Sequence, residues 1–334
     1  MTSISLVICT YQRPQAIVVA LDSVLFQSRP PDEIIVVDSS EDNQTELAIS
    51  SHELGPSITY IMVDESERGL TRQRNRGISL ASMDVVAFID DDVVLEPDYI
   101  LELGLAFDRH PEAVGIGGSI NGQEWLPPEA AQPKHFVVEG WGTKDSFRWR
   151  VRRYLHLDSP LPPGWMPASG HGRSASYPPT GKDYQVEFIM GGVSGYRRDL
   201  FNSIQFSPWF EGYGLYEDLD FSTRASRLGS LYLSTKVRLD HYHEPSGRPD
   251  HVKYGRMVVT NGWRVWRTRW PMPSLKDRAK WWLTTLLLIV ARALGPGDRK
   301  AAMNEALGRL RAIPLVARAE FSPRVRARLL ASER

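Results

Sequence analysis

Short apolar runs alternate with helical stretches through the N-terminal third of the chain, and this alternation limits the folds open to it. The predicted strands cover residues 3–9, 33–38, 58–63 and 85–89, and the predicted helices cover residues 14–27, 71–81 and 97–109. The apolar runs are continuous, which is typical of parallel strands buried on both faces. Strand, turn and helix in this order predict an α/β fold with a mostly parallel sheet flanked by helices, in which ligands bind at the carboxyl ends of the strands.

The periodicity fails between residues 121 and 187, where prolines and glycines are frequent, so an irregular insertion is expected there. Regular structure resumes at Phe188, with a helix from about Glu217 to Gly229 and a strand over residues 231–239. We therefore expect a catalytic domain over residues 1–250, which includes the insertion, and a basic, mostly helical extension over residues 251–334.

The net formal charge is zero, but the charge is unevenly distributed. Residues 274–334 hold 13 Lys or Arg against 5 Asp or Glu, a net charge of +8, which leaves −8 on residues 1–273. Such a tail suits either an anionic membrane surface or a solvated helix face. Its apolar segment at 281–291 is shorter than the about 20 residues that span a bilayer, so a helix lying on the membrane and a helix packed on the protein both remain open.

Cys9 is the single cysteine, which rules out an intramolecular disulfide or a cysteine-based metal site. No basic and apolar leader precedes the first predicted strand. A cytoplasmic protein is therefore expected, either free or peripheral on the inner face of the membrane, and no nucleic-acid partner is expected.

Three adjacent carboxylates, Asp90, Asp91 and Asp92, follow directly after the predicted strand at 85–89. Neighbouring carboxylates at a strand end repel one another unless a cation is supplied. Oxygen ligands of this kind suit Mg²⁺ or Mn²⁺. The alternative is an acidic turn before Pro97 without any metal.

Polar side chains also follow the other predicted strands. Thr10 and Tyr11 follow the first strand, Asp38 ends the second and Asp64 follows the third. Because parallel strands end at one edge of the sheet, these side chains are expected to converge there on a pocket for a base and a ribose. Each of them alone could equally be a turn residue.

Two further segments carry candidate chemistry. Gly191 and Gly192 allow close backbone approach to a sugar or phosphate, or else form a tight turn. Glu217 and Asp218 offer a carboxylate base, or else two acidic residues favoured by the dipole at the start of a helix.

The successive motifs VICTYQRP, GLTRQRNRG, FIDDD and EDLDF, at residues 7–14, 69–77, 88–92 and 217–221, resemble those of family 2 glycosyltransferases in order and spacing. The resemblance covers roughly residues 3–245. It implies the glycosyltransferase A fold, a nucleotide diphosphate sugar as donor, a divalent cation (Mn²⁺ or Mg²⁺) and inversion at the anomeric carbon.

The resemblance also implies residue roles. Asp92 would hold the metal together with His241 or His243, and Asp218, supported by Glu217, would be the base that accepts the proton of the acceptor hydroxyl. Gly191 and Gly192 resemble the family's wall of the donor-sugar and acceptor site. The residues expected to bind the nucleotide sugar are Thr10, Tyr11, Arg13, Asp38, Asp64, Arg74, Asn75, Asp90 and Asp91, with Asp90 near the ribose.

The expected function is an inverting, metal-dependent hexosyl-type glycosyltransferase that assembles a surface polysaccharide or glycoconjugate. Family resemblance favours UDP or dTDP as the nucleotide, and the acceptor would be a glycan or a lipid-linked sugar. The alternative is a protein of the same fold that binds the nucleotide sugar without turnover. The presence of both Asp92 and Asp218 argues against that alternative, because a binder needs no acceptor-side base.

Overall fold

The computed structural model describes residues 1–123, 125–132, 136–143, 145–210, 212–242 and 249–331. Two units divide the chain. Unit 1 comprises Met1–Trp125 and Ala175–Gly247, and unit 2 comprises Leu126–Ser174 and Arg248–Arg334. This division differs from the predicted one at residue 250, because most of the insertion belongs with the C-terminal helices.

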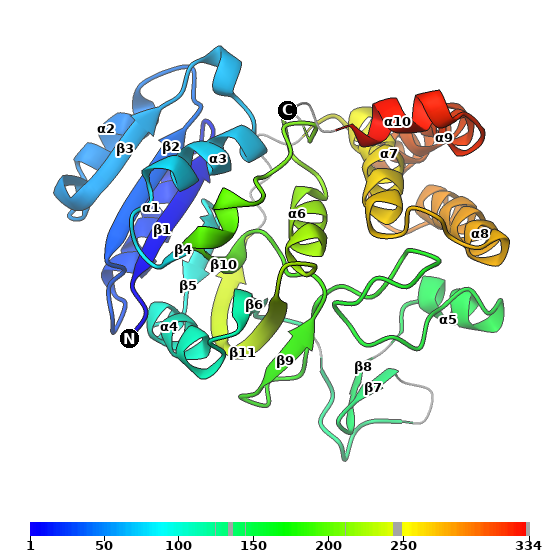
Figure 1. Ribbon diagram of the computed structural model, residues 1–334, viewed down its shortest axis with the longest axis horizontal. Helices are drawn as coiled ribbons and strands as arrows, with labels where there is room; N and C mark the ends of the chain where they lie inside the picture. Colours follow the sequence, from blue (N-terminus) through cyan, green and yellow to red (C-terminus); the bar gives the residue numbers. More distant parts are fainter. Residues whose placement is uncertain (124, 133–135, 144, 211, 243–248, 332–334) are drawn as a thin grey trace. The chain divides into compact units, whose positions relative to one another are not determined.

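Unit 1 is a mixed sheet flanked by helices (Figure 1). Its strands are β1 (Ile4–Thr10), β2 (Glu33–Asp38), β3 (Ile58–Met62), β4 (Val85–Asp90), β5 (Val93–Leu95), β6 (Ala113–Ile120), β9 (Asp183–Val186), β10 (Val193–Arg197) and β11 (Ser230–His241). Its helices are α1 (Pro14–Leu25), α2 (Gln44–Ser50), α3 (Leu70–Leu80), α4 (Tyr99–Arg109) and α6 (Glu217–Ala225). The α/β class predicted from the sequence is confirmed.

The strands lie in the order β3-β2-β1-β4-β10-β6-β11-β5, and β9 pairs with β11. The first four strands in this order run parallel, as their continuous apolar runs predicted, and β6 also pairs in parallel with β11. β10 runs antiparallel between β4 and β6, and β5 and β9 run antiparallel to β11. The carboxyl ends of β1, β2 and β4 therefore meet at one edge of the sheet.

Helices cover both faces of this sheet. On one face, Leu21 of α1 and Leu103 of α4 belong to the same buried core as Leu6 of β1. On the other face, α3 approaches β1 so closely that a Cβ atom at Gly77 would collide with Val7. A strand with apolar residues on both sides can be buried only by such double coverage, which explains the unbroken apolar runs.

The predicted elements of the N-terminal half are present, with ends shifted by one or two residues. β5 was not predicted, because three residues are too few for a periodic signal. Where the segment predicted to be irregular is described, it contains short elements only, which are β7 (Phe136–Val138), β8 (Trp141–Thr143), α5 (Phe147–Tyr154) and β9.

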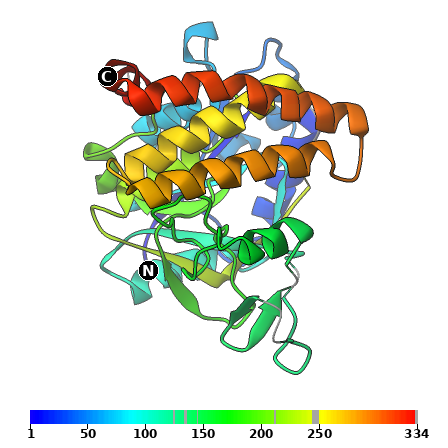
Figure 2. The same ribbon diagram turned by 90° about the vertical axis from the view of Figure 1, so that its right-hand side faces the viewer.

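Unit 2 contains β7, β8, α5 and four C-terminal helices, α7 (His251–Arg269), α8 (Leu275–Ala293), α9 (Arg299–Phe321) and α10 (Pro323–Leu330). Figure 2 shows α7, α8 and α9 as three long helices side by side. Asp250, Ser274 and Asp298 cap their N-termini through side-chain acceptors, and the Ser274 hydroxyl also donates to the Asp277 carboxylate at 2.6 Å. Among the described residues, no helix is both long and apolar enough to cross a membrane.

Stacked aromatic rings explain why residues 126–174 belong with these helices. The Trp266 ring of α7 stacks on the Trp281 ring of α8, with centroids 5.0 Å apart, and Trp266 Nε1 donates to the carbonyl of Ala168. His171 lies on Trp281 and makes a 3.0 Å hydrogen bond with Thr285. The insertion thus supplies part of the core of unit 2.

Candidate active site

The carboxyl ends of three neighbouring strands place polar side chains in one row. Thr10, at the end of β1, lies beside Asp38 at the end of β2, and Cys9 lies beside Asp90 at the end of β4. The strand pairing alone sets these positions. This is the edge at which an open α/β sheet binds its ligands.

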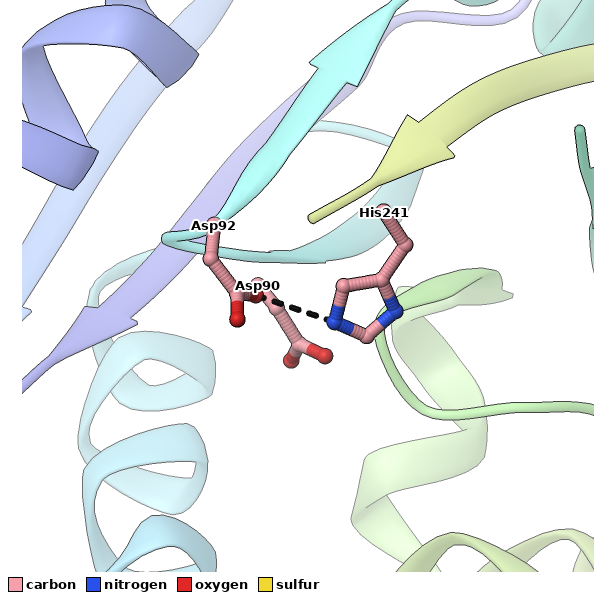
Figure 3. Close-up of side chains that lie close together, drawn as sticks. All are labelled: Asp90, Asp92 and His241. Carbon is pink, nitrogen blue, oxygen red and sulfur yellow. Dashed lines mark ion pairs between the residues drawn. The ribbon is translucent and has the colours of Figure 1, made fainter. Parts of the chain in front are cut away.

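Asp90, Asp92 and His241 form a group that could hold a metal ion (Figure 3). One ligand atom from each residue lies within 4.8 Å of the others, and His241 Nε2 lies 3.0 Å from Oδ1 of Asp92. Antiparallel pairing of β11 with β5 places His241 opposite Val93, and the imidazole therefore lies next to Asp92. The two carboxylates are oxygen ligands of the kind that suits Mn²⁺ or Mg²⁺.

The sequence left the choice between His241 and His243 open. The structure brings His241 to Asp92, and His243 lies outside the described residues. Asp90 was expected near a ribose, and its carboxylate lies in the same group as Asp92.

Asp91 points away from this group. Its carboxylate is buried and accepts hydrogen bonds from Thr10 Oγ1 at 2.8 Å and from Arg13 Nη1 at 2.7 Å. Burial raises the pKa of Asp91 to about 6, and the Arg13 guanidinium opposes that rise. Arg13 also lies 3.7 Å from Asp92, so it links two of the three consecutive aspartates.

A buried arginine connects the metal group with the start of α6. Arg74 of α3 donates to Oε1 of Glu217 and lies 3.5 Å from Asp90, while the Phe88 and Phe206 rings lie within 5.6 Å of its guanidinium carbon. Oε2 of Glu217 is buried and has no hydrogen-bond partner among the described residues. Burial raises the pKa of Glu217 to about 8, against the effect of Arg74.

Asp218 is held differently from its neighbour. Its two oxygens accept hydrogen bonds from the backbone N–H groups of Gly191, at 3.1 Å, and of Leu219, at 2.7 Å. The residue is half-buried, and burial raises its pKa. A carboxylate that is fixed by the backbone and not neutralised by a close cation remains able to accept a proton.

Gly191 and Gly192 are required for space. A Cβ atom at Gly191 would lie 2.6 Å from Nη1 of Arg74 and 2.8 Å from Oε1 of Glu217. A Cβ atom at Gly192 would collide with the Asp90 carboxylate. The two glycines therefore let β10 begin directly against the charged groups.

The carboxylates of the site outnumber its cationic groups. Five carboxyl groups, of Asp90, Asp91, Asp92, Glu217 and Asp218, face two guanidinium groups, of Arg13 and Arg74, and the imidazole of His241. Carboxylates gathered in this way repel one another, and a bound cation relieves that repulsion.

Other predicted site residues make structural contacts. The buried Asp38 accepts from Ser40 and from the Tyr60 hydroxyl. Asp64 accepts a hydrogen bond from Ser66 in an exposed turn, and the Asn75 side chain pairs with the backbone of Phe206. Tyr11 is half-buried and follows Thr10. Asp38 and Asn75 could therefore bind a nucleotide only through the acceptor and donor positions that these contacts do not occupy.

Sequence reasoning missed Gln73, which joins the ends of two strands. Its Nε2 donates to the carbonyls of Thr10 and Val37, both at 2.9 Å. Gln73 is buried on the sheet side of α3. A polar residue on the inward side of a predicted helix was the available signal, since a buried amide needs partners.

Replacing Arg74 by Met is expected to lower the free energy of unfolding by about 3–5 kcal/mol, because it leaves a buried carboxyl group without its cation. Urea denaturation would measure the loss. Arg72→Met is the matched control, since Arg72 on the same helix donates only to the backbone of Ser66, and a change below about 1 kcal/mol is expected there. Combining Arg74→Met with Glu217→Gln should recover part of the loss. Equal losses in Arg74→Met and its control Arg72→Met would show that the ion pair of Arg74 with Glu217 adds no stability.

Comparisons with known proteins agree with this architecture. The sequence profile described as glycosyl transferase family 2 matches residues 5–204. A glucosyl-dolichyl phosphate glucuronosyltransferase from Haloferax volcanii is 32% identical over 139 residues, which are 41% of this chain and 42% of that protein. The hyaluronan synthase of Pasteurella multocida is 23% identical over 273 residues, which are 75% of this chain and 25% of that protein. The chain thus spans less than half of the length of either relative.

Among solved structures, the mannosyltransferase PcManGT from Pyrobaculum calidifontis, in complex with GDP-Man and Mn²⁺, superposes with a TM-score of 0.52. The match covers 98% of this chain and 83% of that one, at 15% sequence identity. Such a match shows the fold, and it confirms the glycosyltransferase A fold.

Proposed function

The chain belongs to glycosyl transferase family 2, and on that premise we propose that it transfers a hexosyl-type sugar from a nucleotide diphosphate sugar to an acceptor hydroxyl with inversion at the anomeric carbon. The observation that carries this proposal is the group of Asp90, Asp92 and His241 at the carboxyl edge of the sheet. A diphosphate donor needs a cation at this edge, and few other ligands would explain three such side chains together.

Asp90, Asp92 and His241 would hold the cation, Mn²⁺ or Mg²⁺. Their ligand atoms lie close enough together for one ion to reach all three. The carboxylates suit either metal, and a neutral imidazole could complete the coordination of Mn²⁺. When bound, the cation neutralises negative charge on the departing diphosphate.

Asp218 is the proposed base. It would accept the proton of the acceptor hydroxyl as the new C–O bond forms and the bond from the anomeric carbon to the diphosphate oxygen breaks. The backbone N–H groups of Gly191 and Leu219 would orient its carboxylate throughout. Arg74 and Glu217 would keep the adjacent wall in place, because their ion pair is buried directly beneath Gly191.

Thr10, Arg13 and Asp91 form a hydrogen-bonded set at the end of β1 and are proposed to shape the nucleotide side of the site. Family resemblance favours UDP or dTDP. The complex of the similar mannosyltransferase contains GDP-Man, which makes GDP a third nucleotide to compare.

The proposed acceptor is a glycan or a lipid-linked sugar in the assembly of a surface polysaccharide or glycoconjugate. Two relatives support this choice by their names, one a transferase acting on glucosyl-dolichyl phosphate and the other a polysaccharide synthase. A lipid-linked acceptor would place the enzyme on the cytoplasmic face of a membrane.

The nucleotide diphosphate of the true donor, at about 100 times its dissociation constant, is expected to stabilise the protein by roughly 2.7 kcal/mol when Mn²⁺ is present. Thermal unfolding with UDP, dTDP and GDP, with Mn²⁺ or with a chelator, would measure this. One nucleotide should stabilise the protein, and the chelator should remove its effect. Measuring whether the protein releases that nucleotide from its nucleotide sugars would then distinguish a transferase from a protein that only binds the donor. Stabilisation by no nucleotide under any condition would contradict the proposal.

A further inference from the structure

The two units carry opposite formal charges of equal size. Unit 2 contains 26 Lys or Arg and 10 Asp or Glu, a net charge of +16. Unit 1 contains 14 Lys or Arg and 30 Asp or Glu, a net charge of −16. The zero net charge of the chain therefore conceals a strongly cationic unit, and the basic character extends beyond the tail into the insertion.

Helix α9 exposes apolar side chains on one of its faces. Met303, Leu307, Leu310 and Phe321 are spaced so that they share one face of the helix, and they are 39% to 86% exposed. The opposite face is buried through small residues, since a Cβ atom at Gly308 would collide with the backbone of α7. The helix thus packs on one side and presents apolar side chains on the other.

Helix α8 repeats this pattern. Leu283, Leu286, Val290 and Leu294 follow at intervals of three and four residues, and they are 44% to 81% exposed. Trp281 on the other side of the helix is buried against α7. Single exposed leucines are ordinary, but several exposed apolar residues on one face of each of two neighbouring helices mark an interaction surface.

Basic side chains border the row on α9. Lys300, Arg311 and Arg318 are exposed, and helical spacing places them together along one flank of that row. They make no ion pair with any carboxylate in the described part of the chain. Their charge is therefore available to an external partner.

The carboxylates of α8 and α9 do not offset this charge. Glu305 is buried between Arg292 and Arg309, and Glu320 is buried next to Arg267 and Trp263.

The two other acidic residues of this helix pair lie at helix starts. Asp298 caps α9, and Asp277 hydrogen-bonds with Ser274 at the start of α8. Beyond their first turns, the exposed sides of both helices consequently present no acidic side chain.

From these observations we infer that the exposed faces of α8 and α9 bind an anionic lipid surface. Apolar rows inserted below the headgroups, with lysine and arginine beside the lipid phosphates, are the arrangement of a helix lying in a membrane interface. A second copy of this chain fits less well, because two units of net charge +16 would repel each other. The inference does not depend on glycosyl transfer, since vesicle binding needs neither donor nor cation.

Co-sedimentation of the full-length protein with phosphatidylcholine vesicles, with and without phosphatidylglycerol, tests the inference. Wild type should bind only the vesicles that contain phosphatidylglycerol, and added salt should weaken this binding. The triple change Lys300→Glu, Arg311→Glu and Arg318→Glu should reduce affinity roughly 100-fold or more, given the contribution of each basic residue near an anionic surface. Arg311→Lys with Arg318→Lys is the charge-conserving control and should bind as wild type.

The apolar row is tested by Leu307→Gln with Leu310→Gln, which should weaken vesicle binding about tenfold or more while the melting temperature stays near that of wild type. Val19→Gln with Leu47→Gln, two exposed aliphatic residues on helices of unit 1, is the matched control and should bind as wild type. Absence of wild-type binding at low salt, or wild-type binding by either altered surface, would overturn the inference. A change of molecular mass in the Leu307 and Leu310 variant without any vesicle binding by wild type would assign the face to a second copy instead.

Discussion

Turnover of the Asp218→Asn variant is expected to fall by about 10²- to 10⁴-fold, which is the usual contribution of a general base, while the dissociation constant of the donor changes little. Asn cannot accept the proton of the acceptor hydroxyl. Steady-state kinetics with a saturating donor, together with donor titration, would measure the two quantities separately.

The geometry of Asp218 adds a second expectation for this variant. Both carboxylate oxygens accept backbone N–H bonds, so an Asn side chain must turn its NH₂ group toward either Gly191 or Leu219. This mismatch should lower stability by about 1–3 kcal/mol, the penalty for an unsatisfied buried donor. Turnover must therefore be expressed per folded molecule, with the folded fraction taken from thermal unfolding.

Asp220→Asn is the matched control on the same helix. The Asp220 carboxylate is buried, and its partner is Arg224, at 2.8 Å. Its substitution should lower stability and leave the turnover of folded molecules unchanged. Glu217→Gln should give a milder loss of turnover than Asp218→Asn, because Gln retains an acceptor oxygen for Arg74. Full activity of folded Asp218→Asn, or loss of turnover in Asp220→Asn alone, would move the base assignment away from Asp218.

The sequence predicted the strands and the edge at which they end because buried parallel strands leave a local signature. Their apolar runs are unbroken, and a polar residue follows each run at the same edge, as Thr10, Asp38 and Asp90 show. The glycine requirement at 191 and 192 was also visible as a motif. Its cause, the closeness of Arg74 and Asp90, was not.

Contacts between distant segments could not be predicted. Arg74 and Glu217 are 143 residues apart, and nothing in the spacing of either motif indicates that they pair. The closeness of His241 to Asp92 depends on the pairing of β11 with β5, a strand too short to recognise from the sequence. Asp91 was grouped with its neighbours because they are adjacent in sequence, whereas successive side chains at a strand end point to different sides and bring it to Thr10 and Arg13 instead.

That the insertion belongs to unit 2 could not be predicted for a similar reason. Residues 126–174 lack periodicity, so their partners could not be inferred from pattern. The partners are single aromatic and polar contacts, such as Trp266 with Ala168 and His171 with Thr285. Such contacts leave no repeating trace in the sequence.

The Asp92→Ala variant is expected to lose transfer by a factor on the order of 10³ or more, because several kcal/mol of charge stabilisation depends on the cation. Donor binding should at the same time lose its dependence on Mn²⁺ or Mg²⁺. The carboxylate of Asp92 lies beside Asp90 and 3.0 Å from His241, so the substitution removes one of the three proposed ligands. Donor titration with and without the metal would measure the change.

The Asp91→Asn variant tests whether the metal dependence requires Asp92 itself or any carboxylate next to it in the sequence. Asp91 is adjacent in sequence, but its carboxylate is bound to Thr10 and Arg13, so the metal dependence should remain and only a smaller loss of turnover is expected. His241→Ala should weaken the metal dependence. If Asp92→Ala bound the donor with unchanged metal dependence while Asp91→Asn lost it, the ligand would be Asp91, and the strand end would have to turn its side chains the other way when the donor is bound.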